Sequence, residues 1–401
     1  MKKKYIVFGI FAATSLLGFG QQADSSYRKK KVSKTTIQLV YSHYLQNGNH
    51  SAVTGGTGTE KLTVYSPDVT INIQRDSSTS YTINTGVDII SSASTDKIDF
   101  VVSSASKVDN HMYLNGGINK TTRNKQWVLA GNGYFSIESD YLSWGAGFSA
   151  IHTSKDKMSE ISASFDTFFD DLRWGRLSNK KPYKLIYPVE LRYKEWFDTY
   201  KRQSYNASFS LYQTINKKMS LAIFPGISYQ HGLLATPFHR VYFTDSSARV
   251  EKLPANRLKI PIGIQLNTFI GDRYILRSYY RFYWDDFGIV AHTAEVELPV
   301  KLSMAFTLSP FFRFYTQKGA SFFKPFQQHA LQSEFYTSDY DLSSFNSYES
   351  GLELKLNGQG KQPHSLFNKP GLRYAYYKRS DGLHAHTITL ITEFTFQSKH
   401  R

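Results

Sequence analysis

An alternation between two kinds of side chain near the C-terminus limits the possible folds more than any other feature. Every second position from 388 to 396 is apolar or aromatic, apart from one threonine, whereas positions 387, 389, 393 and 395 are polar. Successive side chains of a β-strand point to opposite faces. Segment 386–396 therefore predicts a strand with an apolar outer face, a polar inner face and an aromatic end, as in transmembrane β-barrels.

The same two-residue period recurs through most of the chain. Clear examples are 127–137, 142–148, 205–211, 221–227, 258–266, 274–284, 290–298 and 304–314, with short turns at 216–218, 271–273 and 299–301. Short turns join antiparallel strands, and lipid offers no partner to an edge strand, so the sheet must close. We predict an all-β, antiparallel transmembrane barrel of about 16 strands. The alternative is 12–14 strands if several segments are loops, with 184–196 the least certain.

Loop lengths sort by side in this arrangement. An even strand number places both chain ends in the periplasm, so the turns at 216–218, 271–273 and 299–301 are expected there. The long segments 231–256 and 316–347 then lie outside the cell. Short periplasmic turns and long outer loops are typical of outer-membrane barrels. A soluble β-sandwich, the structural alternative, has no reason to sort its loops by length.

The N-terminus predicts export to the outer membrane of a Gram-negative cell. Three lysines precede an apolar core at 6–17, and Gly18 and Gly20 suit a cleavage site before Gln21. We assign residues 1–20 to a signal peptide, since a spanning helix needs about 20 apolar residues. An N-terminal anchor is the alternative. Residues 21–34, with a basic run at 28–31 and Lys34, form the expected periplasmic leader, and 35–401 the barrel domain.

Composition narrows the classes of function. The chain has no cysteine, which excludes disulfide frameworks, thiolate metal sites and covalent c-type haem. Its 29 Phe and 28 Tyr suit the aromatic girdles of a barrel. A formal net charge of +16 would suit anionic lipid, anionic solutes or nucleic acid. Export makes nucleic acid an unsuitable partner.

Three segments differ from the strands. The Gly-rich segment 49–62 lacks the spacing of a phosphate loop, so we expect a tight outer loop or a segment packed against the inner wall. The near-repeat at 89–94 and 101–106 is either an inward constriction or a hairpin of the wall. The loops at 237–243 and 334–341 are aromatic and charged. Asp339 and Asp341 could bind a hard cation, although solvated turn residues are the simpler interpretation.

Charged side chains on the predicted inner face are the candidate functional site. These charged residues and one neighbouring tyrosine lie on three consecutive predicted strands: Arg277, Tyr279, Arg281, Glu295, Glu297 and Arg313. Rings and ladders of charge set the selectivity of channels, and these arginines would favour anions. The alternative is that the charges pair across neighbouring strands and fill a closed barrel.

An enzyme is not predicted, although a barrel-embedded hydrolase is a weak alternative. Five histidines are candidates for a catalytic triad, but none lies near a nucleophile in the sequence: His239, His292, His329, His384 and His386. His384 and His386 share a face, as metal ligands would, but no third ligand is identifiable. Interfacial or solvated histidines are the simpler interpretation. No metal or cofactor is predicted.

Several motifs together resemble a known family. They are the Gly-rich segment, the twin Ser-Ser-Ala-Ser units, segment 310–315 and segment 336–343. Over nearly the whole mature chain they resemble an exported barrel family of Bacteroidota known as a domain of unknown function (DUF3570). The resemblance implies no established activity. It does imply a link to periplasmic redox or electron-transfer partners.

We therefore predict a porin-like outer-membrane channel for small hydrophilic solutes. The alternative function is a scaffold that docks periplasmic, including redox, proteins. The expected partners are outer-membrane lipid and the barrel assembly machinery.

Overall fold

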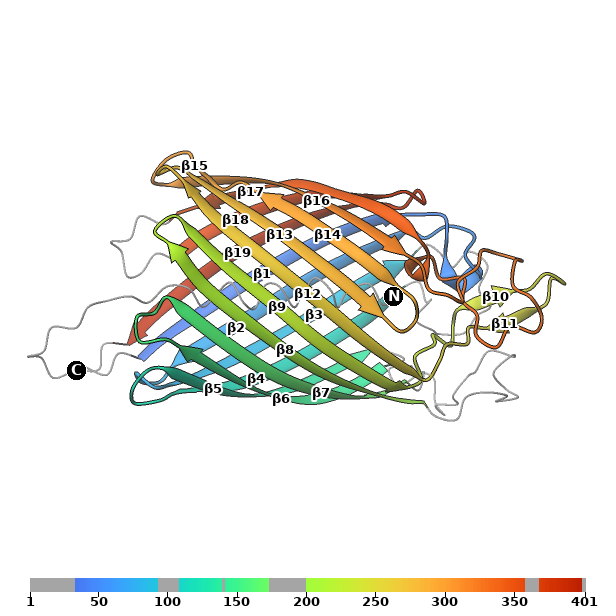
Figure 1. Ribbon diagram of the computed structural model, residues 1–401, viewed down its shortest axis with the longest axis horizontal. Helices are drawn as coiled ribbons and strands as arrows, with labels where there is room; N and C mark the ends of the chain where they lie inside the picture. Colours follow the sequence, from blue (N-terminus) through green and yellow to red (C-terminus); the bar gives the residue numbers. More distant parts are fainter. Residues whose placement is uncertain (1–32, 93–107, 139–140, 173–199, 358–367, 399–401) are drawn as a thin grey trace, which may run out of the picture.

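Sixteen wall strands form the body of the protein in the computed structural model (Figure 1). The structure describes residues 33–92, 108–138, 141–172, 200–357 and 368–398. The strands of the wall are β1 (Ser33–Asn47), β2 (Leu62–Gln74), β3 (Thr79–Ser92), β4 (Val108–Thr121), β5 (Trp127–Glu138), β6 (Tyr141–Thr153), β7 (Ser159–Asp171), β8 (Lys201–Asn216), β9 (Met219–Gly232), β12 (Asn256–Ile270), β13 (Tyr274–Asp285), β14 (Val290–Glu297) with β15 (Val300–Lys301), β16 (Phe306–Lys318), β17 (Phe345–Leu356), β18 (Asn368–Arg379) and β19 (His384–Ser398). The remaining elements lie in loops: η2 (Ala52–Thr54), β10 (Arg240–Tyr242), β11 (Ala248–Val250) and η4 (Tyr340–Leu342).

The sheet is antiparallel throughout and closes on itself. Each wall strand pairs with its neighbours in the chain, and β1 pairs with β19 from Ser33↔Ser398 to Asn47↔His384. Closure leaves no strand edge unpaired, which is what lipid requires. The prediction of about 16 strands is confirmed, and the sandwich alternative is wrong. The least certain segment, 184–196, lies outside the described residues, and β7 pairs directly with β8.

One predicted turn is wrong. The sequence suggested a turn at 299–301, but Val300 and Lys301 pair with β16, and Val300 also pairs with β13. β14 and β15 are thus one wall strand, interrupted at Pro299, which has no N–H to donate to the ladder. Pro299 nevertheless accepts a hydrogen bond from the N–H of Ile275 at 3.0 Å. The chain actually reverses at 302–305, where Met304 is 91% exposed.

The predicted division of faces is confirmed on the outside of the barrel. Large apolar side chains alternate outward and stay more than a third exposed, including Ile388, Leu390 and Phe396 of β19. Trp144 and Phe148 of β6 and Ile264 of β12 follow the same rule. Because this band of exposed apolar side chains is unsuited to water, it suits contact with lipid.

The two ends of the barrel differ. β1 begins and β19 ends at one end, which we call the turn end, where short turns lie at 75–78, 154–158, 217–218 and 271–273. The other end, which we call the loop end, carries the long loops 48–61, 233–255 and 319–344 (Figure 1). The predicted long segments therefore share one end of the barrel, although short turns at 286–289 and 380–383 lie at that end too. Within the described ranges, no helix is long and apolar enough to cross a membrane.

Candidate functional site

The predicted charged residues all lie on the inner face and form a ladder across β13, β14 and β16. Arg277 pairs with Glu297 (Nη1 to Oε1, 3.1 Å), and Tyr279 lies opposite Glu295 in the register. Arg313 lies opposite Glu295, but its ion pair is with Glu349 of β17 at 3.3 Å. The ladder continues onto β17 and β18, where Glu353 meets Lys355 and Arg373. The pairing that the sequence left as an alternative is thus present for Arg277 and Arg313.

Arg281 differs from the other arginines of the ladder. Within the described residues its guanidinium makes no ion pair, although it lies between the paired Arg277 and the strand end. An arginine without a fixed carboxylate keeps its full charge available to a solute in the lumen. Of the predicted residues, Arg281 is therefore the best candidate for direct contact with a passing anion.

A second group of inner charges was missed by the sequence reading. β2, β3, β4 and β7 carry carboxylates toward the lumen, and we call them the acidic wall: Asp68, Asp88, Asp109, Glu160, Asp166 and Asp170. Neutral donors hold two of them. Asp68 accepts from Tyr113 Oη at 2.6 Å and from Asn84 Nδ2 at 2.7 Å, and Asp166 accepts from Tyr134 Oη at 2.8 Å. Phenol and amide donors fix these carboxylates without cancelling their charge.

Another member of the acidic wall is neutralised. Asp170 meets Arg202 of β8 at 2.6 Å and also accepts from Ser143 Oγ at 2.7 Å. Asp68 and Asp166 therefore contribute more uncompensated negative charge than Asp170 does. The sequence did contain a signal for Asp68, because Val69, Ile71 and Ile73 alternate with polar residues on β2.

The acidic wall and the ladder face each other across the barrel. In the closed ring of sixteen wall strands, β4 is the fourth and β14 with β15 is the twelfth, so they are separated by half of the ring. Asp68 and Asp166 lie near the middle of their strands, as Arg281 and Arg313 do. A solute in the lumen would thus pass between carboxylates on one side and arginines on the other.

The long loops at the loop end pack into a cap with its own apolar cores. One core joins Leu233, Ala235, Phe238 and Val250, and a second joins Leu234, Phe287, Ile289 and Ala320. A third joins Val241 and Phe243 to Tyr336. We call loops 48–61, 233–255 and 319–344 together the loop cap. Burial of this kind gives the loops one defined arrangement.

The Gly-rich segment is part of the loop cap. Its His50 ring stacks on Tyr340 with ring centroids 3.8 Å apart. Gly55 has φ +78°, and a Cβ there would overlap the ring of Tyr242, so both the backbone and the contact require glycine. The expectation of a tight outer loop is confirmed, with neighbouring loops as its packing partners. The near-repeat lies mostly in 93–107, outside the described residues.

The sequence matches the family model described as "Protein of unknown function (DUF3570)" over residues 9–389. The chain belongs to the DUF3570 family. No curated protein matches it. Bacteroidota as its source stays a prediction.

Several solved barrels are distantly similar to this DUF3570 protein. OccK1 (OpdK) of Pseudomonas aeruginosa shares 7% identity over 91% of this chain and 99% of its own, with a TM-score of 0.42. A BenF-like porin of Pseudomonas fluorescens Pf-5 shares 8% identity over 91% of this chain and 99% of its own, with a TM-score of 0.43. A bacterial polysaccharide outer membrane secretin shares 9% identity over 91% of this chain and 98% of its own, with a TM-score of 0.46. Likeness at this level describes barrel architecture only.

Among the described residues, the one buried pair of a histidine and a serine does not have the geometry that a hydrolase triad needs. His329 and Ser338 are both buried, with Nε2 and Oγ 3.4 Å apart. However, Nε2 also lies 3.1 Å from the Thr337 carbonyl and 3.2 Å from the Lys324 carbonyl, so it carries the proton and cannot accept one from serine. Burial lowers the pKa of His329, which keeps the ring neutral.

His292, His384 and His386 lie on the outward face near the loop end. His292 Nδ1 is 2.7 Å from Tyr280 Oη, and His386 Nδ1 is 2.8 Å from Tyr374 Oη. The pairing of histidine with tyrosine suits a membrane interface, where rings with polar tips collect. The interpretation of these residues as interfacial agrees with their positions.

Asp339 and Asp341 belong to the loop cap, where each carboxylate has a partner. Asp341 pairs with Arg379 of β18 at 2.6 Å, and Asp339 Oδ2 lies 3.8 Å from His239 Nδ1. Their side chains are 21% and 30% exposed, so the interpretation as solvated turn residues holds only in part. The two carboxylates point to different partners.

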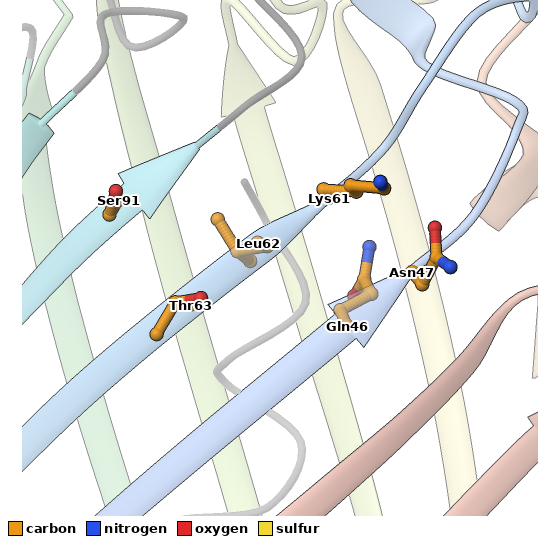
Figure 2. Close-up of a pocket in the computed structure, with 6 residues that line it drawn as sticks. All are labelled: Gln46, Asn47, Lys61, Leu62, Thr63 and Ser91. Atoms are coloured by element: carbon orange, nitrogen blue, oxygen red, sulfur yellow. The ribbon is translucent and has the colours of Figure 1, made fainter.

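A cavity of about 330 Å³ lies at the loop end and is lined by Gln46 and Asn47 of β1 together with Lys61, Leu62, Thr63 and Ser91 (Figure 2). A cavity of about 170 Å³ lies at the turn end and includes Gln38, Lys355 and Glu393. Among the residues that line the 330 Å³ cavity, Lys61 is the one charged group, so this cavity has neither an acid–base pair nor a nucleophile with its base.

Proposed function

We propose that this DUF3570 protein is an outer-membrane, porin-like channel for small hydrophilic solutes. A closed antiparallel ring with outward apolar side chains supports a membrane location, because only barrels and helices satisfy their backbone in lipid. In this orientation the loop end faces the outside of the cell, and the turn end faces the periplasm.

The arrangement of inner charge carries the proposal. In the ring of sixteen wall strands, Asp68 lies seven strands from Arg281 and Asp166 lies six strands from Arg313, and the printed hydrogen-bond donors to both carboxylates are neutral. Oppositely charged sides create a field across the lumen that orients polar solutes and excludes apolar ones. The proposed solutes are therefore small and hydrophilic, and their charge determines which side of the lumen attracts them.

The direction of ion selectivity follows from both sides together. The sequence favoured anions because it revealed only the ladder, whereas the acidic wall attracts cations. We propose that the two sides act in opposition. Removing an arginine from the ladder then shifts ion selectivity toward cations, and removing a carboxylate from the acidic wall shifts it toward anions.

A planar-bilayer recording tests this function. The refolded mature chain should give discrete conductance steps, and Arg281→Ala should shift the reversal potential in a KCl gradient toward cation preference. Arg277→Ala should shift it less, because Glu297 already neutralises Arg277. Lys120→Ala is the matched control, since Lys120 lies on the outward face at the turn end. Silence from folded, heat-modifiable protein would contradict the proposal.

We also propose the partners that the sequence predicts. Outer-membrane lipid and the barrel assembly machinery would be required by any such barrel. Docking of periplasmic redox proteins stays a prediction, and co-purification of such proteins from the periplasm would support it.

A further inference from the structure

The loop cap contains a buried cluster of one histidine and two carboxylates. His239 Nδ1 lies 3.4 Å from Glu251 Oε1 and 3.8 Å from Asp339 Oδ2. One ligand atom from each of the three residues falls within 4.8 Å of the others. The side chains of His239 and Glu251 are 8% and 2% exposed and that of Asp339 is 21% exposed, so the cluster lies in the interior of the loop cap with one partly exposed member.

The backbone of two loops brings these residues together. The N–H of Glu251 donates to the carbonyl of His239 at 3.0 Å, which holds them side by side in loop 233–255. Lys252 and Tyr336 then exchange two backbone hydrogen bonds, at 3.1 and 2.9 Å, which brings loop 319–344 alongside. The cluster therefore lies where two loops meet that are far apart in the sequence.

Hydrogen bonds from neighbouring groups fix the orientation of both carboxylates. Glu251 accepts from Thr337 Oγ1 at 2.6 Å and from the Thr236 N–H at 2.7 Å. Asp339 Oδ1 accepts from the Asp341 N–H at 2.9 Å, so Oδ2 is turned toward the imidazole. Hydrogen bonds of this kind commonly orient the ligands of metal ions.

The cluster brings two carboxylates and one imidazole together in the loop cap. Carboxylate oxygens and imidazole nitrogens are ligands that Zn²⁺ takes in proteins. A divalent cation among them would offset the repulsion between the two carboxylates.

We propose that His239, Glu251 and Asp339 bind one divalent transition-metal ion of the Zn²⁺ class, which joins loop 233–255 to loop 319–344. Zn²⁺ takes imidazole and carboxylate ligands at about 2.0–2.2 Å, so tetrahedral ligand atoms lie about 3.3 Å apart. The 3.4 and 3.8 Å separations need only a small contraction. Ca²⁺ prefers six to eight oxygens and Mg²⁺ an octahedral oxygen shell, so a site with a histidine nitrogen disfavours both.

Binding of the ion would close the loop cap more tightly. The three ligands come from two loops, so each loop loses freedom when the ion is bound, and a water molecule can complete the fourth position. This inference concerns the loops and does not depend on conduction through the lumen. A failed metal titration would leave the proposed channel intact, and a silent bilayer would leave the metal site intact.

The test is a Zn²⁺ titration of the refolded, tag-free mature chain in detergent after treatment with a chelator. Isothermal titration calorimetry and competition with a chromogenic zinc indicator should give one Zn²⁺ per chain, with much weaker binding of Ca²⁺ and Mg²⁺. His239→Gln and Asp339→Asn should each weaken binding by about 100-fold or more. His231→Gln is the matched control, because His231 is an exposed histidine at the end of β9 that bonds to Asn256.

Two results would overturn the inference. One is the absence of one-to-one binding by the wild-type chain at Zn²⁺ concentrations up to about 100 μM, which corresponds to a weak site. The other is equal affinity in the wild type, Asp339→Asn and His231→Gln, which would assign the bound ion to surface histidines. If His239→Gln fails the heat-modifiability test for folding, Asp339→Asn decides, because the exchange keeps the size of the side chain.

Discussion

Arg379 at the end of β18 connects the barrel wall to loop 319–344. Its guanidinium is buried and pairs with Asp341 at 2.6 Å and with Asp381 at 2.5 Å. It also donates to the carbonyl of Tyr340 at 2.7 Å and lies 3.9 Å from the ring centroid of Phe345. Arg379→Met would keep much of the apolar stem but remove every one of these polar contacts.

The size of the effect follows from burial. Breaking a buried ion pair by removing one partner costs about 3–5 kcal/mol, and a cation–π contact adds about 0.5–1 kcal/mol. Asp341 is 30% exposed and can be partly hydrated after the change, so we use the lower end, about 3 kcal/mol. Because about 1.4 kcal/mol corresponds to a factor of ten, opening of loop 319–344 should become about 100-fold more frequent.

Hydrogen exchange measured by mass spectrometry checks this value. The amides of Ala320 and Leu342 hydrogen-bond within the loop and should lose about two orders of magnitude of protection. Amides in the middle of β18 should keep theirs, since the ring is closed on both sides of that strand. Arg123→Met, in an exposed turn at the turn end, is the control. Unchanged protection of the loop in Arg379→Met would refute the assigned role of this ion pair.

Three further predictions concern the wall and the loop cap. Gly351→Ala should destabilise the barrel by about 1–3 kcal/mol in urea unfolding, because its Cβ would overlap a carbonyl of β18, whereas Gly116→Ala, with open space around it, should not. Leu390 points outward on β19, so Leu390→Arg should lower the free energy of unfolding in lipid by about 2–4 kcal/mol. Thr389 points toward the lumen, so Thr389→Arg should lower it much less. Equal losses of stability would contradict the division of faces. The raised pKa of Asp339 means that the closed cap binds more protons than the open one, so without metal the protection of loop 319–344 should increase as the pH falls from 7 toward the ordinary range of a carboxyl group. Bound Zn²⁺ should reverse this dependence, because its ligands must lose protons, and Asp339→Asn should abolish both effects.

Much of the fold could be predicted because alternation is a local property. Each strand carries its own division into faces, and the outward band of β19 follows from its sequence alone. The turn at 299–301 was predicted wrongly because proline usually ends a strand, whereas Pro299 interrupts one whose hydrogen bonds resume at Val300. Pairing of Val300 depends on β13 and β16, which local sequence does not specify.

The site was predicted only in part for the same physical reason. Arg277, Arg281 and Arg313 stood out because they lie on consecutive, regular strands. The acidic wall is spread over β2 to β7, and its position opposite the ladder depends on closure of the whole ring. The cluster around Glu251 joins two loops that meet only through tertiary contacts, so no spacing in the sequence indicates it.

The reversal potential of paired variants in a planar bilayer tests the central claim most directly. The double variant Asp68→Asn/Asp166→Asn should shift selectivity toward anions, and Arg281→Ala should shift it toward cations, because these residues place charges of opposite sign on the wall of one lumen. Opposite shifts in folded protein, with Lys120→Ala unchanged, would support a channel with a transverse field. Conductance without a shift in either variant, or shifts of the same sign in both, would contradict the account.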